Sequence, residues 1–184
     1  MKNISLLASL QSAKRQAGLT LIELIASLAI LALVIGGALS LYTSASNSQA
    51  TTQSVSEFTS LRGAVKGLYA SQADYSTLTN QLLVVSGKVP ATLNVVTTGT
   101  PPTATSTLTT SFAGVVDVTG AATTFSVRVT LVPQAVCIGL LSASQGWNSI
   151  AVGTGTPLTA FPITPAASVA ACAAATQTIT LTAL

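Results

Sequence analysis

The chain begins with a polar, basic segment, residues 1–18, which is followed by a long apolar run over residues 19–42. Glu23 is the only charged residue in that run. A helix of this length spans about 36 Å at about 1.5 Å per residue, which is enough to cross a bilayer with some tilt. The pattern therefore predicts a membrane-crossing helix that carries a carboxylate near its start.

A second helical pattern continues the first. Polar residues, among them Glu57 and Arg62, fill most faces of this segment, and no proline before Pro90 forces a break. We therefore expect a single helix from Leu19 to near Tyr69, about 75 Å long. Its one buried stripe consists of apolar residues that recur every three or four positions, namely Val55, Phe58, Leu61, Val65 and Leu68.

The stretch over residues 71–100 predicts a second, short helix. Ser76 or Thr77 fits its N-cap, and Gly87 fits its end shortly before a proline. Residues 97–107, TTGTPPTATST, are expected to form a loop, because they combine glycine and prolines with small polar residues.

Strand patterns follow this loop. Residues 125–131 alternate strictly between apolar and polar, and residues 112–118 precede them across Gly120, so the two segments predict a hairpin. Residues 176–184 alternate again and predict a last strand with Ile179 and Leu181 inward. The inward residues expected in the hairpin are Phe125, Val127, Val129 and Leu131.

Between these strands, residues 133–144 change to a helical period. Pro133 suits the first turn of a helix. The apolar face of that helix would comprise Val136, Cys137, Leu140 and Leu141. Together the elements indicate an α+β fold, with one long helix covering a face of an antiparallel sheet.

Cys137 and Cys172 are the only cysteines. Behind a membrane-crossing segment, such usage favours one structural disulfide, with two free, buried thiols as the alternative. A disulfide would tie the C-terminal loop region back to the fold.

The composition excludes several function classes. Only 6% of residues are charged, histidine is absent, and no acidic cluster suits a metal, so we expect no enzyme, no catalytic residue, no metal and no cofactor. The net charge of +3 comes from residues 1–18, because four basic residues balance four acidic ones from Leu19 onward. This distribution indicates targeting rather than nucleic-acid binding. The single tryptophan, Trp147, is expected to pack rather than to form a receptor platform.

Three interpretations compete for residues 1–42. A secretory signal peptide has a shorter apolar core and would be cut near Ser46. A plain membrane anchor explains the length and the basic flank of Lys14 and Arg15, which places the N-terminus in the cytoplasm. Neither interpretation gives Glu23 a role.

The third interpretation gives Glu23 a role. Gly18 followed by LTLIE resembles the leader-cleavage site of type IV pilins. The resemblance implies that prepilin peptidase cuts after Gly18 and methylates the new amine of Leu19, and that Glu23 is retained for assembly. A charged amine and a carboxylate are costly in a dry helix bundle unless they pair, so a contact between Glu23 and the Leu19 amine of a neighbouring subunit would also set the axial register.

The long leader and Leu19 at the first mature position resemble the type IVb branch. Two later segments, YSTLTNQLLVVSGKVP (residues 75–90) and VPQAVCIGLLSASQGW (residues 132–147), resemble major pilins of conjugative plasmids and enteric pathogens. This resemblance implies a disulfide between Cys137 and Cys172 that encloses the C-terminal region. The expected divisions are a cleaved leader, 1–18, a transmembrane and filament-core half-helix, 19–42, and a periplasmic or extracellular domain, 43–184.

On this resemblance, the chain is expected to be the major prepilin of a type IVb pilus used for adhesion, aggregation or conjugative mating contact. It would be held in the inner membrane as a precursor and then exported into an extracellular homopolymer. Its other partners would be prepilin peptidase and the pilus assembly machinery. The alternatives are a minor pilin or tip adhesin, and a pseudopilin of type II secretion.

Overall fold

The computed structural model describes residues 20–72, 74–100, 104–143 and 145–184. The chain divides into two compact units, Met1–Tyr42 and Thr43–Leu184. The leader, Gly18 and Leu19 lie outside the described residues.

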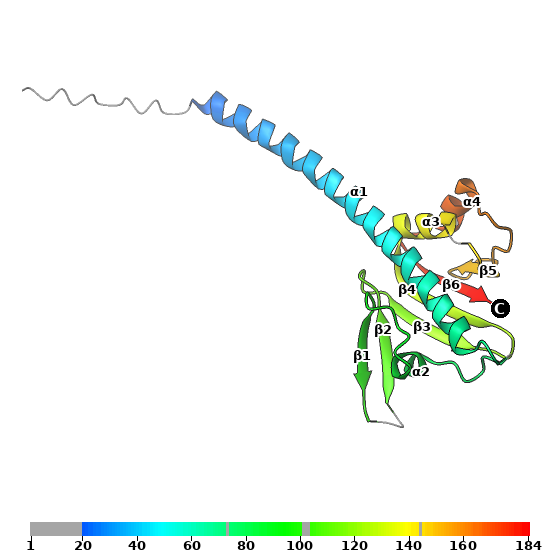
Figure 1. The fold of residues 1–184 in the computed structure, drawn as a ribbon. Helices are drawn as coiled ribbons and strands as arrows, with labels where there is room; N and C mark the ends of the chain where they lie inside the picture. The colour runs from blue at the N-terminus through cyan, green and yellow to red at the C-terminus, as the bar shows by residue number, and fades with distance from the viewer. Residues whose placement is uncertain (1–19, 73, 101–103, 144) are drawn as a thin grey trace, which may run out of the picture. The chain divides into compact units, whose positions relative to one another are not determined.

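One helix, α1, runs from Leu21 to Leu68 and confirms the predicted single long helix (Figure 1). Its 48 residues correspond to about 72 Å at 1.5 Å per residue. The helix continues through Gly36 and Gly37, where two glycines cost about 1 kcal/mol each relative to alanine. Glycine there weakens the helix without ending it.

The second unit contains a six-stranded antiparallel sheet in the order β1-β2-β3-β4-β6-β5 (Figure 1). The predicted hairpin is present as β3 and β4, and the predicted last strand is β6. The strands are β1 (Asn94–Thr98), β2 (Thr105–Thr109), β3 (Val115–Gly120), β4 (Phe125–Pro133), β5 (Ser149–Val152) and β6 (Thr176–Ala183). The shorter helices are α2 (Asn80–Val85), α3 (Gln134–Ala143) and α4 (Pro165–Ala171).

The core lies between the sheet and the part of α1 within the second unit. Phe58, Leu61 and Val65 of α1 are buried together with the inward residues of the strands. Ile179 and Leu181 of β6 are fully buried, as predicted. The predicted apolar face of α3 is buried as well and comprises Val136, Cys137, Leu140 and Leu141.

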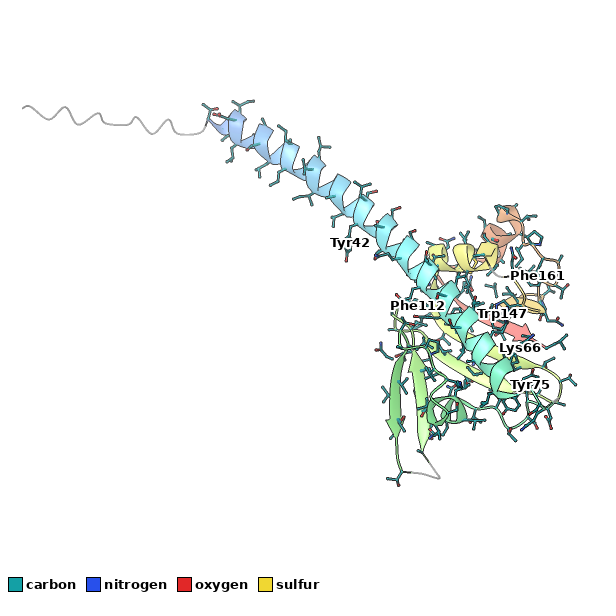
Figure 2. All side chains as sticks on the ribbon, in the orientation of Figure 1. Tyr42, Lys66, Tyr75, Phe112, Trp147 and Phe161 are labelled. Atoms are coloured by element: carbon teal, nitrogen blue, oxygen red, sulfur yellow. A yellow bond between two sulfur atoms is a disulfide. The ribbon has the colours of Figure 1, made fainter. Side chains whose placement is uncertain are left out.

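A row of aromatic rings joins the end of α1 to the sheet. The Tyr69 and Tyr75 ring centroids are 5.1 Å apart, and Tyr75 lies 5.2 Å from Phe125. Phe125 in turn lies 6.3 Å from Trp147 in an edge-on arrangement. Figure 2 labels Tyr75 and Trp147 near this end of α1. Trp147 is buried in the core, which supports its expected packing role.

The buried stripe of α1 differs from the predicted one. Glu57, which we placed on a polar face, is only 3% exposed, whereas Val55 is half-buried. At 100° per residue, Glu57 lies on the same face as Ser54 and Leu61, three and four positions away, and that face turns inward. The buried carboxylate accepts a 2.7 Å hydrogen bond from Nε2 of Gln53.

The N-cap of the second helix also differs from the predicted one. Thr79, rather than Ser76 or Thr77, is the N-cap of α2, and its hydroxyl accepts from the backbone N–H of Leu82. Ser76 belongs to the preceding turn, where its N–H donates to Asp74 Oδ1 at 2.8 Å. Hydrogen bonds from Ser76 lower the pKa of the Asp74 carboxyl below its ordinary value.

The predicted loop over residues 97–107 is partly strand, because β1 ends at Thr98 and β2 begins at Thr105. Threonine is β-branched and suits a pleated strand, a preference that outweighed the loop-like composition. β5 and α4 were not predicted. Pro133 is the last residue of β4 rather than part of the first turn of α3.

Leu131 does not face the core. The pairing of β4 with β6 shifts between Val129 and Val132, and Leu131 sits in this irregularity with φ of 55°. The extra residue reverses the alternation, so Leu131 is 54% exposed and Val132 is fully buried. The strict alternation that we predicted therefore ends at Val129.

Candidate assembly site

The first turn of α1 places Glu23 in a capping arrangement. Thr20 precedes the helix, and its Oγ1 accepts a 3.4 Å hydrogen bond from the backbone N–H of Glu23. The Thr20 carbonyl also accepts from the N–H groups of Glu23 and Leu24, each at 3.0 Å. Threonine at the N-cap with glutamate three residues later is the sequence pattern of a capping box. Sequence reasoning missed this feature, although TLIE contains the pattern.

Glu23 lies at the beginning of an exposed apolar surface. Every residue from 20 to 46 is exposed, and this helix is the one among the described residues that is long and apolar enough to cross a membrane (Figure 2). Large bare apolar surfaces in proteins mark contacts with lipid or with other chains. The exposed large side chains are Leu21, Ile22, Leu24, Ile25, Leu28, Ile30, Leu31, Leu33, Val34, Ile35, Leu39, Leu41 and Tyr42.

Gly18 and Leu19, the two expected processing residues, lie outside the described residues, whereas Glu23 lies within them. The described geometry gives Glu23 a position in the first turn, where the helix dipole favours a negative charge. Its partner across a subunit boundary stays a prediction.

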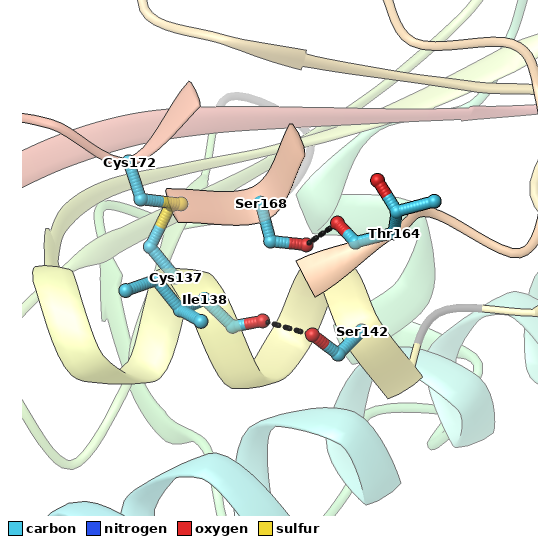
Figure 3. The surroundings of a disulfide bond; sticks show 6 residues. All are labelled: Cys137, Ile138, Ser142, Thr164, Ser168 and Cys172. Carbon is cyan, nitrogen blue, oxygen red and sulfur yellow. Dashed lines mark hydrogen bonds between the residues drawn. A yellow bond between two sulfur atoms is a disulfide. The ribbon is translucent and has the colours of Figure 1, made fainter. Parts of the chain in front are cut away.

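A disulfide joins Cys137 of α3 to Cys172, the C-cap residue of α4, with their Cα atoms 6.0 Å apart (Figure 3). Both cysteines are fully buried. In the chain-entropy model, closing a loop of sequence separation 35 contributes about 3–4 kcal/mol. The alternative of two free thiols is therefore wrong for this structure.

Local bonds shape α4 for this crosslink. Thr164 is its N-cap and accepts from the N–H of Ala167, and Pro165 begins the helix with a backbone already suited to it. The Ser168 hydroxyl donates to the Thr164 carbonyl at 3.2 Å (Figure 3). On α3, the Ser142 hydroxyl donates to the Ile138 carbonyl at 2.8 Å (Figure 3).

α3 packs against α1 through a small residue. A Cβ at Gly139 would clash with the Thr51 methyl group, so the glycine permits close approach of the two helices. Farther along α1, the Arg62 guanidinium contacts the segment that follows α3, donating to the Gln145 carbonyl at 3.1 Å. These contacts hold the disulfide-closed region to the helix within the second unit.

A side chain replaces strand pairing where β2 and β3 separate. The two strands pair only at residues 108–109 with 115–116. Beyond that point, Asn80 of α2 donates from Nδ2 to the Val116 carbonyl at 3.0 Å and accepts from the Val118 N–H at 2.9 Å. The amide thus satisfies two backbone groups that would otherwise need a neighbouring strand.

A long helix, an antiparallel sheet and a disulfide-closed C-terminal region together define the type IV pilin fold. The family model described as PilS N terminal matches residues 46–184, and the prokaryotic N-terminal methylation motif matches residues 13–39. The chain therefore belongs to the PilS family of type IV pilins.

Two curated proteins share 34% identity with this chain over 85 residues. Both are major structural subunits of the bundle-forming pilus, one from Escherichia coli O127:H6 (strain E2348/69 / EPEC) and one from Escherichia coli O111:H-. Each match covers 46% of this chain and 44% of the relative, so the chain matches less than half of their length.

A solved structure shares the fold. The crystal structure of a type IV b pilin from Salmonella typhi aligns with a TM-score of 0.55 at 20% identity, covering 69% of this chain and 95% of that one. At 20% identity this similarity shows a shared fold, that is, a shared arrangement of helices and strands.

Proposed function

We propose that this chain is the precursor of the major structural subunit of a type IVb pilus. Residues 1–18 are a leader that prepilin peptidase removes after Gly18, and the new amine of Leu19 is then methylated. Residues 19–42 anchor the precursor in the inner membrane and later form the filament core. Residues 43–184 form the periplasmic and then extracellular head.

One observation supports this function most strongly: a bare apolar helical surface with a single carboxylate at its beginning. A helix apolar on all sides needs lipid or copies of itself around it. The methylation motif covers this segment, and the named relatives are major pilus subunits. In a pilin homopolymer, the same helical surface is surrounded by lipid before assembly and by copies of itself in the filament.

The proposed assembly step pairs Glu23 of an incoming subunit with the Leu19 amine of its neighbour. Both charges would otherwise stay unpaired in an apolar bundle, at a cost of several kcal/mol. Apolar packing supplies most of the association energy, and the ion pair selects one axial register. The cap at Thr20 fixes the backbone from which Glu23 projects.

The low charge of the head suits dense packing in a filament. From Leu19 onward the formal charges cancel, so identical subunits meet little like-charge repulsion. The assembled fibre would serve adhesion, aggregation or conjugative mating contact, and the assembly machinery would be the remaining partner.

Two measurements test this function. Mass spectrometry of surface filaments should give a mature N-terminus at Leu19 that carries a methyl group. The same filaments, sheared from cells, should consist mainly of this chain. An N-terminus near Ser46 would contradict the cleavage site, and a trace amount in the fibres would favour a minor pilin or tip adhesin. A short periplasmic fibre without surface filaments would favour a pseudopilin.

A further inference from the structure

The outer edge of the sheet at β1 is bare. All five residues of β1, Asn94–Thr98, are exposed, and the strand pairs with β2 alone among the described residues. Val95 is 42% exposed and Val96 is 59% exposed, on opposite faces of the strand. An edge strand presents unpaired backbone donors and acceptors that can pair with another strand.

Three of the features that commonly protect an edge strand, namely charged residues, proline and a β-bulge, are absent from β1. β1 contains no charged residue and no proline, and its pairing with β2 has no bulge. Indeed no charged residue occurs between Lys88 and Asp117. A regular, uncharged edge of this kind is a template on which another strand can pair.

The opposite edge of the sheet is different. Ile150 of β5 exchanges two backbone hydrogen bonds with Leu158, of 2.9 and 2.7 Å, so a loop residue occupies that edge. A sheet that continued from the β1 edge of one copy to the β5 edge of the next would have to displace this bridge. The pairing that needs no rearrangement joins β1 to β1.

We propose that β1 docks on β1 of a second copy of this chain, antiparallel, and that this contact holds neighbouring pili together. This inference rests on the proposed function, which supplies many copies at high local concentration. The uncharged strand suits a copy of itself, because identical strands then meet without repulsion. The contact would join two six-stranded sheets edge to edge.

Symmetry assigns this contact to separate filaments. Antiparallel pairing of two identical strands is a two-fold, isologous contact, whereas successive subunits of a helical filament meet head to tail. A β1–β1 contact therefore cannot be the repeated joint within one polar filament. It links subunits of adjacent filaments, and many weak contacts along their length add up through multivalency.

The pairing has a defined centre. When all five residues pair, Asn94 lies opposite Thr98 of the other copy, and Val96 lies opposite its own counterpart. Side chains directly opposite each other on antiparallel strands have Cβ atoms about 4.5–5.5 Å apart. A charge introduced at Val96 is thus placed against itself in every contact.

The test uses Val96→Lys and Val96→Glu in the full-length precursor, expressed in cells that assemble filaments. Electron micrographs of the unsubstituted pili should show lateral bundles, whereas each variant alone should form single filaments without bundles. Mixing purified filaments of the lysine variant with those of the glutamate variant should restore bundles, because opposite charges then face each other. Added salt should weaken the restored bundles.

Val169→Lys is the matched control, because Val169 is 53% exposed and lies in α4, outside the β1 edge. It introduces the same charge and should leave bundling unchanged. A second measurement replaces Val96 with cysteine: oxidised filaments should yield disulfide-linked dimers, whereas Val169→Cys filaments should not.

Several results would overturn the β1 contact. These are unsubstituted pili that do not associate, bundles that persist in Val96→Lys, or mixed filaments that stay separate. Loss of filaments in Val96→Lys but not in Val169→Lys would place β1 inside the filament and would also refute it. If the unsubstituted chain forms no filament at all, the proposed function fails instead.

Discussion

The guanidinium carbon of Arg62 lies 5.6 Å from the centroid of the Trp147 ring. The same side chain donates a 3.1 Å hydrogen bond to the Gln145 carbonyl, and a Cβ at Gly146, which has φ of 80°, would clash with it. One cation on α1 thus organises the turn that follows α3. The positive φ of Gly146 is a conformation that other residues rarely adopt, which explains why this turn contains glycine between Gln145 and Trp147.

Arg62→Ala should lower the free energy of unfolding by about 1–2 kcal/mol, because it removes a cation–π contact and a charge-assisted hydrogen bond. Arg62→Lys should recover part of the loss, since lysine keeps the charge but not the planar guanidinium. Thermal unfolding followed by circular dichroism measures both variants. Lys66→Ala, an exposed cation one turn along the helix, is the control and should change stability little. Equal losses at the two positions would contradict the proposed role of Arg62.

Asn80→Ala should destabilise the head by about 1–3 kcal/mol, because it leaves the Val118 N–H and the Val116 carbonyl without their partner. Asn80→Asp is nearly isosteric, but it can no longer donate to the carbonyl and should also destabilise. Denaturant unfolding measures the two variants against the unsubstituted protein. An aspartate variant as stable as the original would show that the donor half of this interaction contributes nothing.

The disulfide gives a prediction with a built-in control. Replacing Cys137 and Cys172 together with alanine should cost about 2–5 kcal/mol of stability and lower the melting temperature. Reductant should lower the melting temperature of the original protein toward that of the variant and leave the variant unchanged. If the variant and the oxidised original protein had the same melting temperature, the disulfide would contribute nothing to stability.

Long regular patterns made much of this fold predictable. The helix of α1, the β3–β4 hairpin and the inward faces of α3 and β6 follow from periodicity, because burial there repeats over many residues. Residue 131 departs from its pattern because one extra residue in β4 reverses the faces. No local sequence feature marks that insertion, since it is set by pairing with β6, a strand far along the chain.

The other errors have a similar physical origin. Glu57 is buried by tertiary packing that overrides its polarity, and Gln53 supplies the hydrogen bond that makes this burial tolerable. β1 and β2 combine threonine-rich strands with a proline-rich connection, so composition alone favoured a loop. The cap at Thr20 is a local feature, because threonine followed three residues later by glutamate already forms the capping-box pattern in the sequence.

Substitutions can distinguish two roles of Glu23: pairing with the Leu19 amine of a neighbouring subunit, and capping the start of α1. Glutamine keeps the capping-box pattern and the volume of the side chain but removes the charge, whereas valine removes both. If the charge pairs with the Leu19 amine of a neighbour, Glu23→Gln should insert in the membrane and be processed, yet assemble filaments as poorly as Glu23→Val. If the glutamate serves only to cap α1, Glu23→Gln should assemble normally.

Filament yield from sheared cells, measured against the membrane-inserted pool of each variant, distinguishes the two roles. Thr20→Ala provides the complementary control, because it removes the cap and keeps the carboxylate. The cap is worth about 1 kcal/mol, whereas an uncompensated charge in an apolar bundle costs several. We therefore expect Thr20→Ala to retain most filaments and Glu23→Gln to lose nearly all of them. Normal filament yield in Glu23→Gln together with loss of filaments in Thr20→Ala would show that Glu23 acts only in capping α1.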